Sequence, residues 1–424
     1  MLKLFNFLLT GLLFLSGGSP GFADQGLGQK IDKILSDPHL AKTQVSIKIV
    51  SLDDHKTVFE KNPDLPLGPA SNTKLITGAA ALSRIGPKTI FTTRFYTEEG
   101  IRNGAIQNLW IKGGGDPLFV TESLQQIIQK FHARHLKQIR GDIIIDDTLF
   151  DEKEKMTYVS PISRTRFNVY TNAFSYNFNR DFRFWWGTEP PDPKGAVVLT
   201  RKAPSPSLMT GEVLKKAFIE NGIQVLGTVR RQPIPSDVKL FYTHHSPPLI
   251  QSIQSLNKYS NNFTAEQLVK VLGLLEGPGP GSSEKGLHVI EDYLEEIGIQ
   301  KGTYVLENGS GLSGKTRFSA SQFVTLLIAI QQSGQKGREF IASLSIAGID
   351  GTLEDRFTKG ELKGNLIAKT GSLDQVSALS GFFVVKRRPY VFSILINDFQ
   401  GEEAKVKKIE EKILSALVPI EGSR

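Results

Sequence analysis

The chain has 424 residues, 39% hydrophobic and 22% charged, so it can bury substantial cores and is globular, not disordered. It contains no cysteine, which excludes disulfide bonds, thiolate catalysis and cysteine-bound zinc or iron–sulfur sites. Its formal net charge of +8 favours anionic surroundings such as lipid head groups or wall polymers. No aromatic-basic binding motif accompanies that charge, so nucleic acid is not expected as a partner.

The first 23 residues have the pattern of a signal peptide. A short positive start at Lys3 precedes the apolar run 4–15, and Gly21-Phe22-Ala23 offers a cleavage site. The run is shorter than a membrane-spanning helix requires. From this signal-peptide pattern we expect an exported, periplasmic protein. The alternative is that the segment is an uncleaved N-terminal anchor.

The two ends of the remaining chain predict one shared sheet. Alternation of apolar and polar residues indicates strands, and amphipathic spacing indicates helices. The expected helices are 26–37, 71–82 and 401–417, and the expected strands are 44–52, 57–60, 366–373, 378–385 and 390–397, the last two forming a hairpin around 386–389. Strands at both ends with flanking helices favour an α/β (α+β) fold built on an antiparallel sheet.

The middle of the chain has a different composition. It contains strand-like pieces at 107–112 and 141–145, all three tryptophans and a proline-rich stretch at 190–193. We therefore expect residues 24–90 and 242–424 to form a catalytic domain, and residues 91–241 to form an inserted mixed α/β domain.

Ser71-Asn72-Thr73-Lys74 is the first candidate for chemistry. Residues i and i+3 share a helix face, so the hydroxyl and the amine can meet. Serine needs a base to become a nucleophile, and lysine can serve when burial and a neighbouring cation lower its pKa. The pattern S-x-x-K alone is weak, because it also begins at Ser236, Ser255, Ser282 and Ser333. Ser71 differs because Gly68-Pro69-Ala70 leads into it and an apolar helix follows.

Ser260-Asn261-Asn262 is the second candidate. Its serine can pass a proton and its second asparagine can bind a substrate amide. The pattern S-x-N also occurs at Ser175 and Ser255, and a helix cap or turn is the structural alternative.

Lys369-Thr370-Gly371 is the third candidate. On a strand, the ammonium and hydroxyl can hold a substrate carboxylate, and the glycine lets a substrate backbone approach closely. A strand that ends in a polar turn is the alternative. The order S-x-x-K, S-x-N, K-T-G is the signature set of penicillin-binding proteins and serine β-lactamases.

Three further segments narrow the resemblance. They are Gly113-Gly114-Gly115-Asp116-Pro117, Asn308-Gly309-Ser310-Gly311-Leu312-Ser313 and Ala347-Gly348-Ile349-Asp350-Gly351-Thr352-Leu353. Together with the three motifs, they make the chain from about Gly26 onward resemble the D-alanyl-D-alanine carboxypeptidase/endopeptidase family of the penicillin-binding protein 4 type.

The resemblance implies a transpeptidase-like core, interrupted by an insert between the first two motifs. It implies catalytic roles for Ser71, Lys74, Ser260, Asn262 and Lys369, and substrate binding by Thr370, Gly371 and Ser372. The oxyanion hole would be the backbone N–H groups of Ser71 and Ser372. Lys74, with Ser260, would take the proton of Ser71, and Lys369 would pair with the substrate anion.

The chain departs from the family pattern at two positions. Asn308 stands where the family usually has Asp, and Gly314 stands where it often has Arg. Asp146 and Asp147 resemble an insert segment that can face a diamino acid of the substrate, a solvated strand end being the alternative.

The implied activity is cleavage of D-alanyl peptides of peptidoglycan through an acyl-enzyme, with acylation by β-lactams and no cofactor. Three alternatives stay open: a serine β-lactamase, a penicillin-recognising esterase or D-aminopeptidase, and an inactive wall-binding scaffold. Contact with a membrane surface is a further expectation, from the basic charge.

Overall fold

The computed structural model describes residues 25–153, 155–159, 166–179 and 205–418, so the predicted signal peptide lies outside the described residues. The chain divides into two compact units. The first contains Met1–Arg84, Ile253–Asn261 and Ile290–Arg424, and the second contains Ile85–Ser252 and Asn262–Val289. The predicted insert 91–241 falls within the second unit, which extends past it on both sides. The assignment of these segments as domains stays a prediction.

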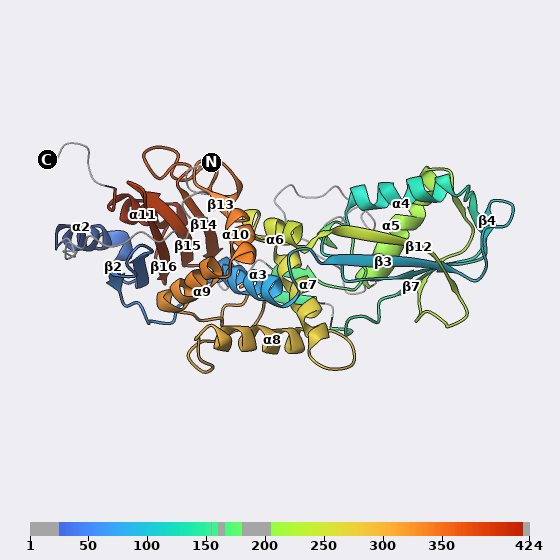
Figure 1. Ribbon diagram of the computed structural model, residues 1–424, viewed down its shortest axis with the longest axis horizontal. Coiled ribbons are helices and arrows are strands. Elements are labelled where there is room, and N and C mark those ends of the chain that lie inside the picture. The colour runs from blue at the N-terminus through green and yellow to red at the C-terminus, as the bar shows by residue number, and fades with distance from the viewer. Residues whose placement is uncertain (1–24, 154, 160–165, 180–204, 419–424) are drawn as a thin grey trace. The chain divides into compact units, whose positions relative to one another are not determined.

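The first unit is built on a six-stranded sheet with the order β13-β14-β15-β16-β1-β2. Both ends of the chain contribute to it, and in Figure 1 the blue β2 lies on the same sheet as the red strands. All neighbouring strands are antiparallel. The strands are β1 (Gln44–Ser51), β2 (Thr57–Lys61), β13 (Ser345–Ile346), β14 (Leu366–Leu373), β15 (Val376–Val385) and β16 (Arg388–Asn397). The predicted antiparallel sheet is confirmed.

Alternate residues of this sheet face two different layers, as the pleat requires. One face packs its apolar side chains, such as Ile47 and Ile394, in a core with α2 (Gln25–Leu35) and α11 (Glu403–Ser415). On the other face, Ser46 Oγ accepts a hydrogen bond from the backbone N–H of Ala320, at the start of α9 (Ala320–Gln332), over 3.1 Å. The sheet is therefore covered by helices on both faces, with α9 on the face opposite α11.

The other helical segments of the first unit surround this framework. They are η1 (Pro38–Leu40), η2 (Ala70–Asn72), α3 (Thr73–Arg84), α10 (Gln335–Ala342), η6 (Gly351–Leu353) and the parts of α6 (Leu249–Lys258) and α8 (Ser283–Glu296) that belong to this unit. The predicted N-terminal and C-terminal helices match α2 and α11 within three residues at each end.

The hairpin between β15 and β16 is tighter than the sequence indicates. Lys386 and Arg387 alone form the turn, with φ angles of 48° and 67°. Positive φ at both central residues is the geometry of two-residue hairpins, because it matches the twist of the strands. Arg388 and Pro389, expected in the turn, therefore belong to β16, where Pro389 lies opposite Val384.

The second unit contains a five-stranded mixed sheet with the order β11-β7-β5-β3-β12, a three-stranded sheet β10-β6-β4 and the hairpin β8-β9. Its strands are β3 (Ile90–Thr97), β4 (Ala105–Ile106), β5 (Leu109–Lys112), β6 (Gln138–Ile139), β7 (Ile143–Asp146), β8 (Lys155–Val159), β9 (Arg166–Tyr170), β10 (Gln224–Val225), β11 (Val229–Arg231) and β12 (Lys239–Pro248). Its other helical segments are α4 (Thr121–Ala133), η3 (Asn177–Asn179), α5 (Pro206–Glu220), α7 (Asn262–Leu272) and η5 (Gly273–Leu275). Side chains such as Phe131 and Phe218, from α4 and α5, pack with Ile111 of β5 and Ile143 of β7 in one core.

Within the described part of the chain, we find no helix that is both long enough and apolar enough to cross a membrane.

Candidate active site

Ser71 lies in the short turn η2, immediately before helix α3. The residue before it, Ala70, has a φ of 45°, in the left-handed region that costs a non-glycine residue about 1–2 kcal/mol. The Thr73 hydroxyl donates to the Ala70 carbonyl over 2.9 Å and holds this turn. Strained backbone of this kind concentrates at functional sites, so the conformation supports Ser71 as a site residue.

Lys74 contacts the Ser71 hydroxyl directly. Its Nζ lies 2.7 Å from Ser71 Oγ and 2.6 Å from the carbonyl oxygen of Ser310, and the lysine side chain is fully buried. A neutral amine has two N–H donors and one lone pair. In that state it can donate to the Ser310 carbonyl while its lone pair accepts the Ser71 proton, as activation of a serine by a base requires.

The segment 308–313 packs against the face of α3 that carries Lys74. Besides the Ser310 carbonyl, the Gly309 carbonyl accepts a hydrogen bond from the Thr77 hydroxyl over 2.7 Å. Asn308 Oδ1 accepts from the backbone N–H of Gly311 over 2.8 Å. An aspartate would offer the same acceptor, so Asn308 preserves this turn where the family usually has Asp.

The K-T-G strand lies beside the Ser71 turn. A Cβ added at Gly371 would stand 2.5 Å from the Pro69 carbonyl oxygen and 3.1 Å from the Ser71 nitrogen. We expected Gly371 to admit a substrate backbone. In the structure, it is the backbone of the Ser71 turn that approaches Gly371 closely. Ser372 follows on the same strand, in register with Ser377 of β15.

Lys369 is the second buried lysine of this site. Its side chain is fully buried and its Nζ donates to the Thr370 carbonyl over 2.8 Å. Burial lowers the pKa of Lys369 to about 7, because removal from water penalises the charged form. Near neutral pH, Lys369 can therefore be present in both protonation states.

This lowered pKa predicts a pH-dependent stability. Below about pH 7, Lys369 is charged in both the folded and the unfolded protein, so burial of its charge destabilises the folded protein by the full amount. Between about pH 7 and about pH 10.4 the folded protein carries neutral Lys369, and the destabilisation falls as the pH approaches the value at which the unfolded lysine also loses its proton. We expect Lys369→Met to gain stability relative to the wild type at about pH 6, with a gain that shrinks by about pH 10. Urea unfolding across this range measures it. Lys359→Met, at an exposed lysine, is the control. A difference between Lys369→Met and wild type that is constant with pH would contradict the prediction.

The S-x-N motif occupies the connection between two helices. Ser260 lies between α6, which ends at Lys258, and α7, and it has a φ of 54°. Its context is thus a left-handed turn. Asn262 is the first residue of α7 and belongs to the second unit, whereas Ser260 and Asn261 belong to the first.

Asp146 and Asp147 are buried in the second unit, at 3% and 6% exposure. Their alternative interpretation as a solvated strand end is therefore wrong, because internal donors replace water. Asp147 pairs with Arg231 at 2.8 Å and accepts from the Ser207 hydroxyl at 2.5 Å. Burial raises the pKa of Asp146, but hydrogen bonds from Thr148 and other groups outweigh it, and the net shift is downward. Contact of either carboxylate with substrate stays a prediction.

The pKa of Asp116, in the Gly113–Pro117 motif, is shifted in the opposite direction, upward. Its Oδ1 accepts from the backbone N–H of Leu118 over 2.8 Å, which makes a tight turn. Burial raises the pKa of Asp116 to about 7. The motif therefore forms a packed turn of the second unit.

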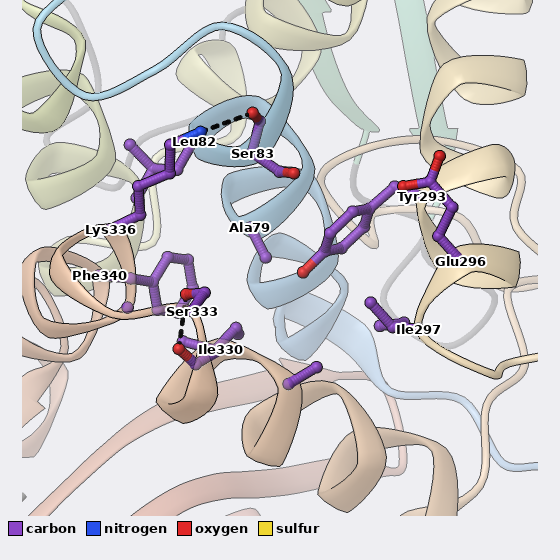
Figure 2. Close-up of a pocket in the computed structure, with 12 residues that line it drawn as sticks. Ala79, Leu82, Ser83, Tyr293, Glu296, Ile297, Ile330, Ser333, Lys336 and Phe340 are labelled. Carbon is purple, nitrogen blue, oxygen red and sulfur yellow. Dashed lines mark hydrogen bonds between the residues drawn. The ribbon is translucent and has the colours of Figure 1, made fainter. Parts of the chain in front are cut away.

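A cavity of about 270 Å³ opens at the C-terminal half of α3, between α8, α9 and α10 (Figure 2). Lys336 and Tyr293 lie on either side of Ala79, and Lys336 donates to the Ser83 carbonyl over 2.9 Å. Burial raises the pKa of Tyr293 to about 12. Neither Ser71, Lys74 nor the K-T-G residues line this cavity, so it is separate from the candidate site.

A metal site would need several ligands placed together. In the ranges that the structure describes, no group of three or more His, Cys, Asp or Glu residues is arranged to hold a metal ion.

The fold and the order of the motifs are those of the penicillin-binding class of peptidases. The family model described as "D-Ala-D-Ala carboxypeptidase 3 (S13) family" matches residues 27–163 and 187–417. The chain belongs to this family and is a peptidase hydrolase.

Curated relatives cover most of the chain. A D-alanyl-D-alanine carboxypeptidase of Actinomadura sp. (strain R39) is 29% identical, over 91% of this chain and 85% of the relative. The D-alanyl-D-alanine carboxypeptidase DacB of Haemophilus influenzae is 23% identical, over 94% of each chain.

Solved structures share the fold. Penicillin binding protein 4 from Haemophilus influenzae matches with a TM-score of 0.76 at 20% identity, over 91% of this chain and 99% of that one. A predatory endopeptidase from Bdellovibrio bacteriovorus matches with a TM-score of 0.62 at 15% identity, over 89% and 93%. The predicted family and fold class are confirmed.

Proposed function

We propose that this peptidase cleaves the terminal D-alanine from peptidoglycan stem peptides through an acyl-enzyme on Ser71. The observation that carries the proposal is the 2.7 Å contact between Lys74 Nζ and Ser71 Oγ, at a fully buried lysine beside the K-T-G strand. The Actinomadura and Haemophilus relatives are described as D-alanyl-D-alanine carboxypeptidases, which supports the choice of substrate.

In the proposed cycle, Ser71 Oγ bonds to the carbonyl carbon of the penultimate D-alanine as its proton passes to Lys74. The backbone N–H groups of Ser71 and Ser372 would hold the oxyanion, each worth ~10²–10³ in rate. The C–N bond then breaks, and the proton passes through Ser260 to the leaving amine of D-alanine. Water hydrolyses the ester and regenerates Ser71. No step requires a cofactor.

Two parts of the substrate would be held away from the reacting bond. Asn262 would bind a substrate amide, and protonated Lys369 with Thr370 would bind the terminal carboxylate. An endopeptidase reaction uses the same acyl-enzyme, with the amine of a cross-linked stem peptide as leaving group. Matched structures include endopeptidases from Bdellovibrio bacteriovorus, which share this fold.

The same site should accept β-lactams, which present a strained amide beside a carboxylate. A solved structure of the Haemophilus penicillin binding protein 4 is a complex with a β-lactam. We further propose that residues 1–23 direct export to the periplasm, where peptidoglycan is the substrate. Contact of the basic surface with membrane stays a prediction.

The test is the intact mass of the protein after incubation with excess benzylpenicillin, together with D-alanine release from a peptide ending in D-Ala-D-Ala. We expect one stable adduct on the peptide containing Ser71, and D-alanine release that Ser71→Ala abolishes. Drug consumption without an adduct would indicate a β-lactamase instead. An unmodified protein, unchanged drug and no D-alanine would contradict the proposal and favour a wall-binding scaffold.

A further inference from the structure

We infer that Asn397 is a positioning residue that holds the backbone before Ser71 in the geometry needed for acylation. This role rests on the proposed function and falls to a residue outside all the sequence motifs. Asn397 is the last residue of β16, and it is buried. We call residues 67–72 the Ser71 loop, because they contain Ser71 and lead directly into α3.

The side-chain amide of Asn397 binds both backbone groups of one residue in the Ser71 loop. The backbone N–H of Gly68 donates to Asn397 Oδ1 over 2.7 Å, and Asn397 Nδ2 donates to the Gly68 carbonyl over 3.0 Å. Two paired residues of an antiparallel sheet exchange hydrogen bonds in the same way. The amide fits this task because it presents an acceptor and a donor side by side. Asn397 therefore serves Gly68 as a strand partner would.

The surroundings of Gly68 make this contact close and buried. A Cβ added at Gly68 would stand 3.0 Å from Asn397 Oδ1 and 3.6 Å from Val376 Cγ2. The preceding residue, Leu67, exchanges backbone hydrogen bonds of 2.9 and 3.0 Å with Phe318. Both partners of Asn397 would be left unsatisfied without it, since the two hydrogen bonds to Gly68 are buried. The start of the Ser71 loop is thus fixed at two successive residues.

The end of the Ser71 loop is bound to the same sheet. Asn72 Nδ2 donates to the hydroxyl of Ser380, on β15, over 2.7 Å. Between the two ends, the Pro69 carbonyl oxygen would lie only 2.5 Å from a Cβ added at Gly371 of β14. Residues 69–71 therefore lie between one point fixed on β16 and another fixed on the neighbouring strand β15.

The strained backbone of the loop explains why these fixed points matter for chemistry. Ala70 has a φ of 45°, and such a conformation persists only where the surrounding structure imposes it. The two bonds from Asn397 to Gly68 supply that restraint two residues before Ala70. Without them the loop can relax. Relaxation would displace Ser71 Oγ from Lys74 Nζ, which now lies 2.7 Å away.

The first test compares Asn397→Ala with the wild type in acylation by benzylpenicillin, followed as adduct mass against time at several drug concentrations. Alanine removes both bonds to Gly68. We expect the limiting acylation rate to fall about 10²-fold, as a displacement of about 1 Å between reacting groups predicts. The half-saturating drug concentration should be unchanged, because Lys369 and Thr370 remain in place on β14. The final yield should still be one adduct per molecule, whereas a loss of folding alone would lower that yield and leave the rate unchanged.

The second test uses Asn397→Asp, which can regain the lost hydrogen bond. An ionised carboxylate accepts from the Gly68 N–H but turns its other oxygen toward the Gly68 carbonyl, whereas a protonated acid offers the donor and acceptor of the amide. Two charged residues are close: Arg317, whose Nη1 would lie 3.6 Å from a Cβ added at Gly68, and Asp398, next in the chain. Arg317 favours the ionised acid, and burial and Asp398 favour the protonated acid.

We expect the acylation rate of Asn397→Asp, divided by the wild-type rate at the same pH, to rise at least about fivefold between about pH 8 and about pH 5, for a carboxyl pKa at or above ~3.9. A carboxylate that acted by raising the pKa of Lys74 would give the opposite sign, with recovery as the pH rises. This ratio keeps the test decisive even if Asn397→Ala does not fold.

Asn365, immediately before β14, provides the matched control. Its amide also donates to a backbone carbonyl, that of Glu361, over 2.7 Å, but this bond spans only four residues of the chain. Asn365→Ala and Asn365→Asp should therefore acylate at the wild-type rate at every pH.

Three results would overturn the inference: a wild-type limiting rate in Asn397→Ala, a lower adduct yield with an unchanged rate, or a rate ratio of Asn397→Asp that is constant or rises with pH. Each requires acylation of the wild type and would leave the proposed function intact. A wild type that forms no adduct would instead contradict the proposed function, and this inference with it.

Discussion

Replacing Lys74 with methionine is expected to slow acylation of Ser71 by benzylpenicillin at least about 10³-fold, because a nucleophile and its base act as a unit. Methionine fills a similar volume at this fully buried position but has no lone pair on nitrogen to take the Ser71 proton. The hydrogen bond from Lys74 to the Ser310 carbonyl is lost as well. The rate is followed as the growth of the adduct mass with time.

Lys336, in helix α10, provides a matched control. Lys336 is also the lysine of an S-x-x-K pattern, which begins at Ser333, but it is exposed and bonds the Ser83 carbonyl. Lys336→Met should keep its acylation rate within about twofold, as surface substitutions away from a site usually do. Comparable rates for Lys74→Met and Lys336→Met would rule out Lys74 as the base. Urea unfolding of both variants shows whether either change acts through stability.

The sheet of the first unit could be predicted because its strands carry strong local signals. The segments that become β1, β15 and β16 are rich in β-branched and aromatic residues. Turn residues and helical spacing separate them from their neighbours. Their pairing across the length of the chain followed from the general preference for one sheet flanked by helices.

The partners within the site could not be predicted in the same way. The carbonyl that accepts from Lys74 belongs to Ser310, 236 residues along the chain, and a backbone carbonyl leaves no mark on the sequence. Thr352 and Thr370 are an ordinary pair of threonines until the fold brings them to 2.8 Å. The segments that contain Ser310 and Thr352 were noticeable as motifs, but their sequences carried no indication of their contacts.

The burial of charged residues is the second feature of the site that could not be predicted from the sequence. Asp and Lys are mostly exposed in proteins unless they are paired, so a solvated strand end was a reasonable alternative for Asp147. Its partner Arg231 lies 84 residues away. Lys369 was expected on a strand where it could hold a substrate carboxylate, but its complete burial, which lowers its pKa, depends on packing that no local pattern reveals.

Substitution of Gly311 is expected to lower both the stability and the acylation rate, because Gly311 packs against the turn that carries Ser71. It has a φ of 74°, and an added Cβ would stand 1.8 Å from the Ala70 carbonyl oxygen and 2.6 Å from Thr73 Oγ1. Gly311→Ala therefore combines left-handed strain, about 1–2 kcal/mol, with a steric conflict of about 1–3 kcal/mol. Gly302 has a φ of 84° and nothing within 4 Å of an added Cβ, so Gly302→Ala measures the strain alone.

We expect Gly311→Ala to lose about 1–3 kcal/mol more unfolding free energy than Gly302→Ala in urea titrations. The conflict falls on the turn that carries Ser71 and on the segment that supplies the Ser310 carbonyl to Lys74. A displacement of about 1 Å between reacting groups can cost about 10²-fold in rate, so the folded fraction of Gly311→Ala should acylate about 10²-fold more slowly. Gly302→Ala should acylate at the wild-type rate. Equal stability and equal acylation in the two variants would show that segment 308–313 does not hold the Ser71 turn.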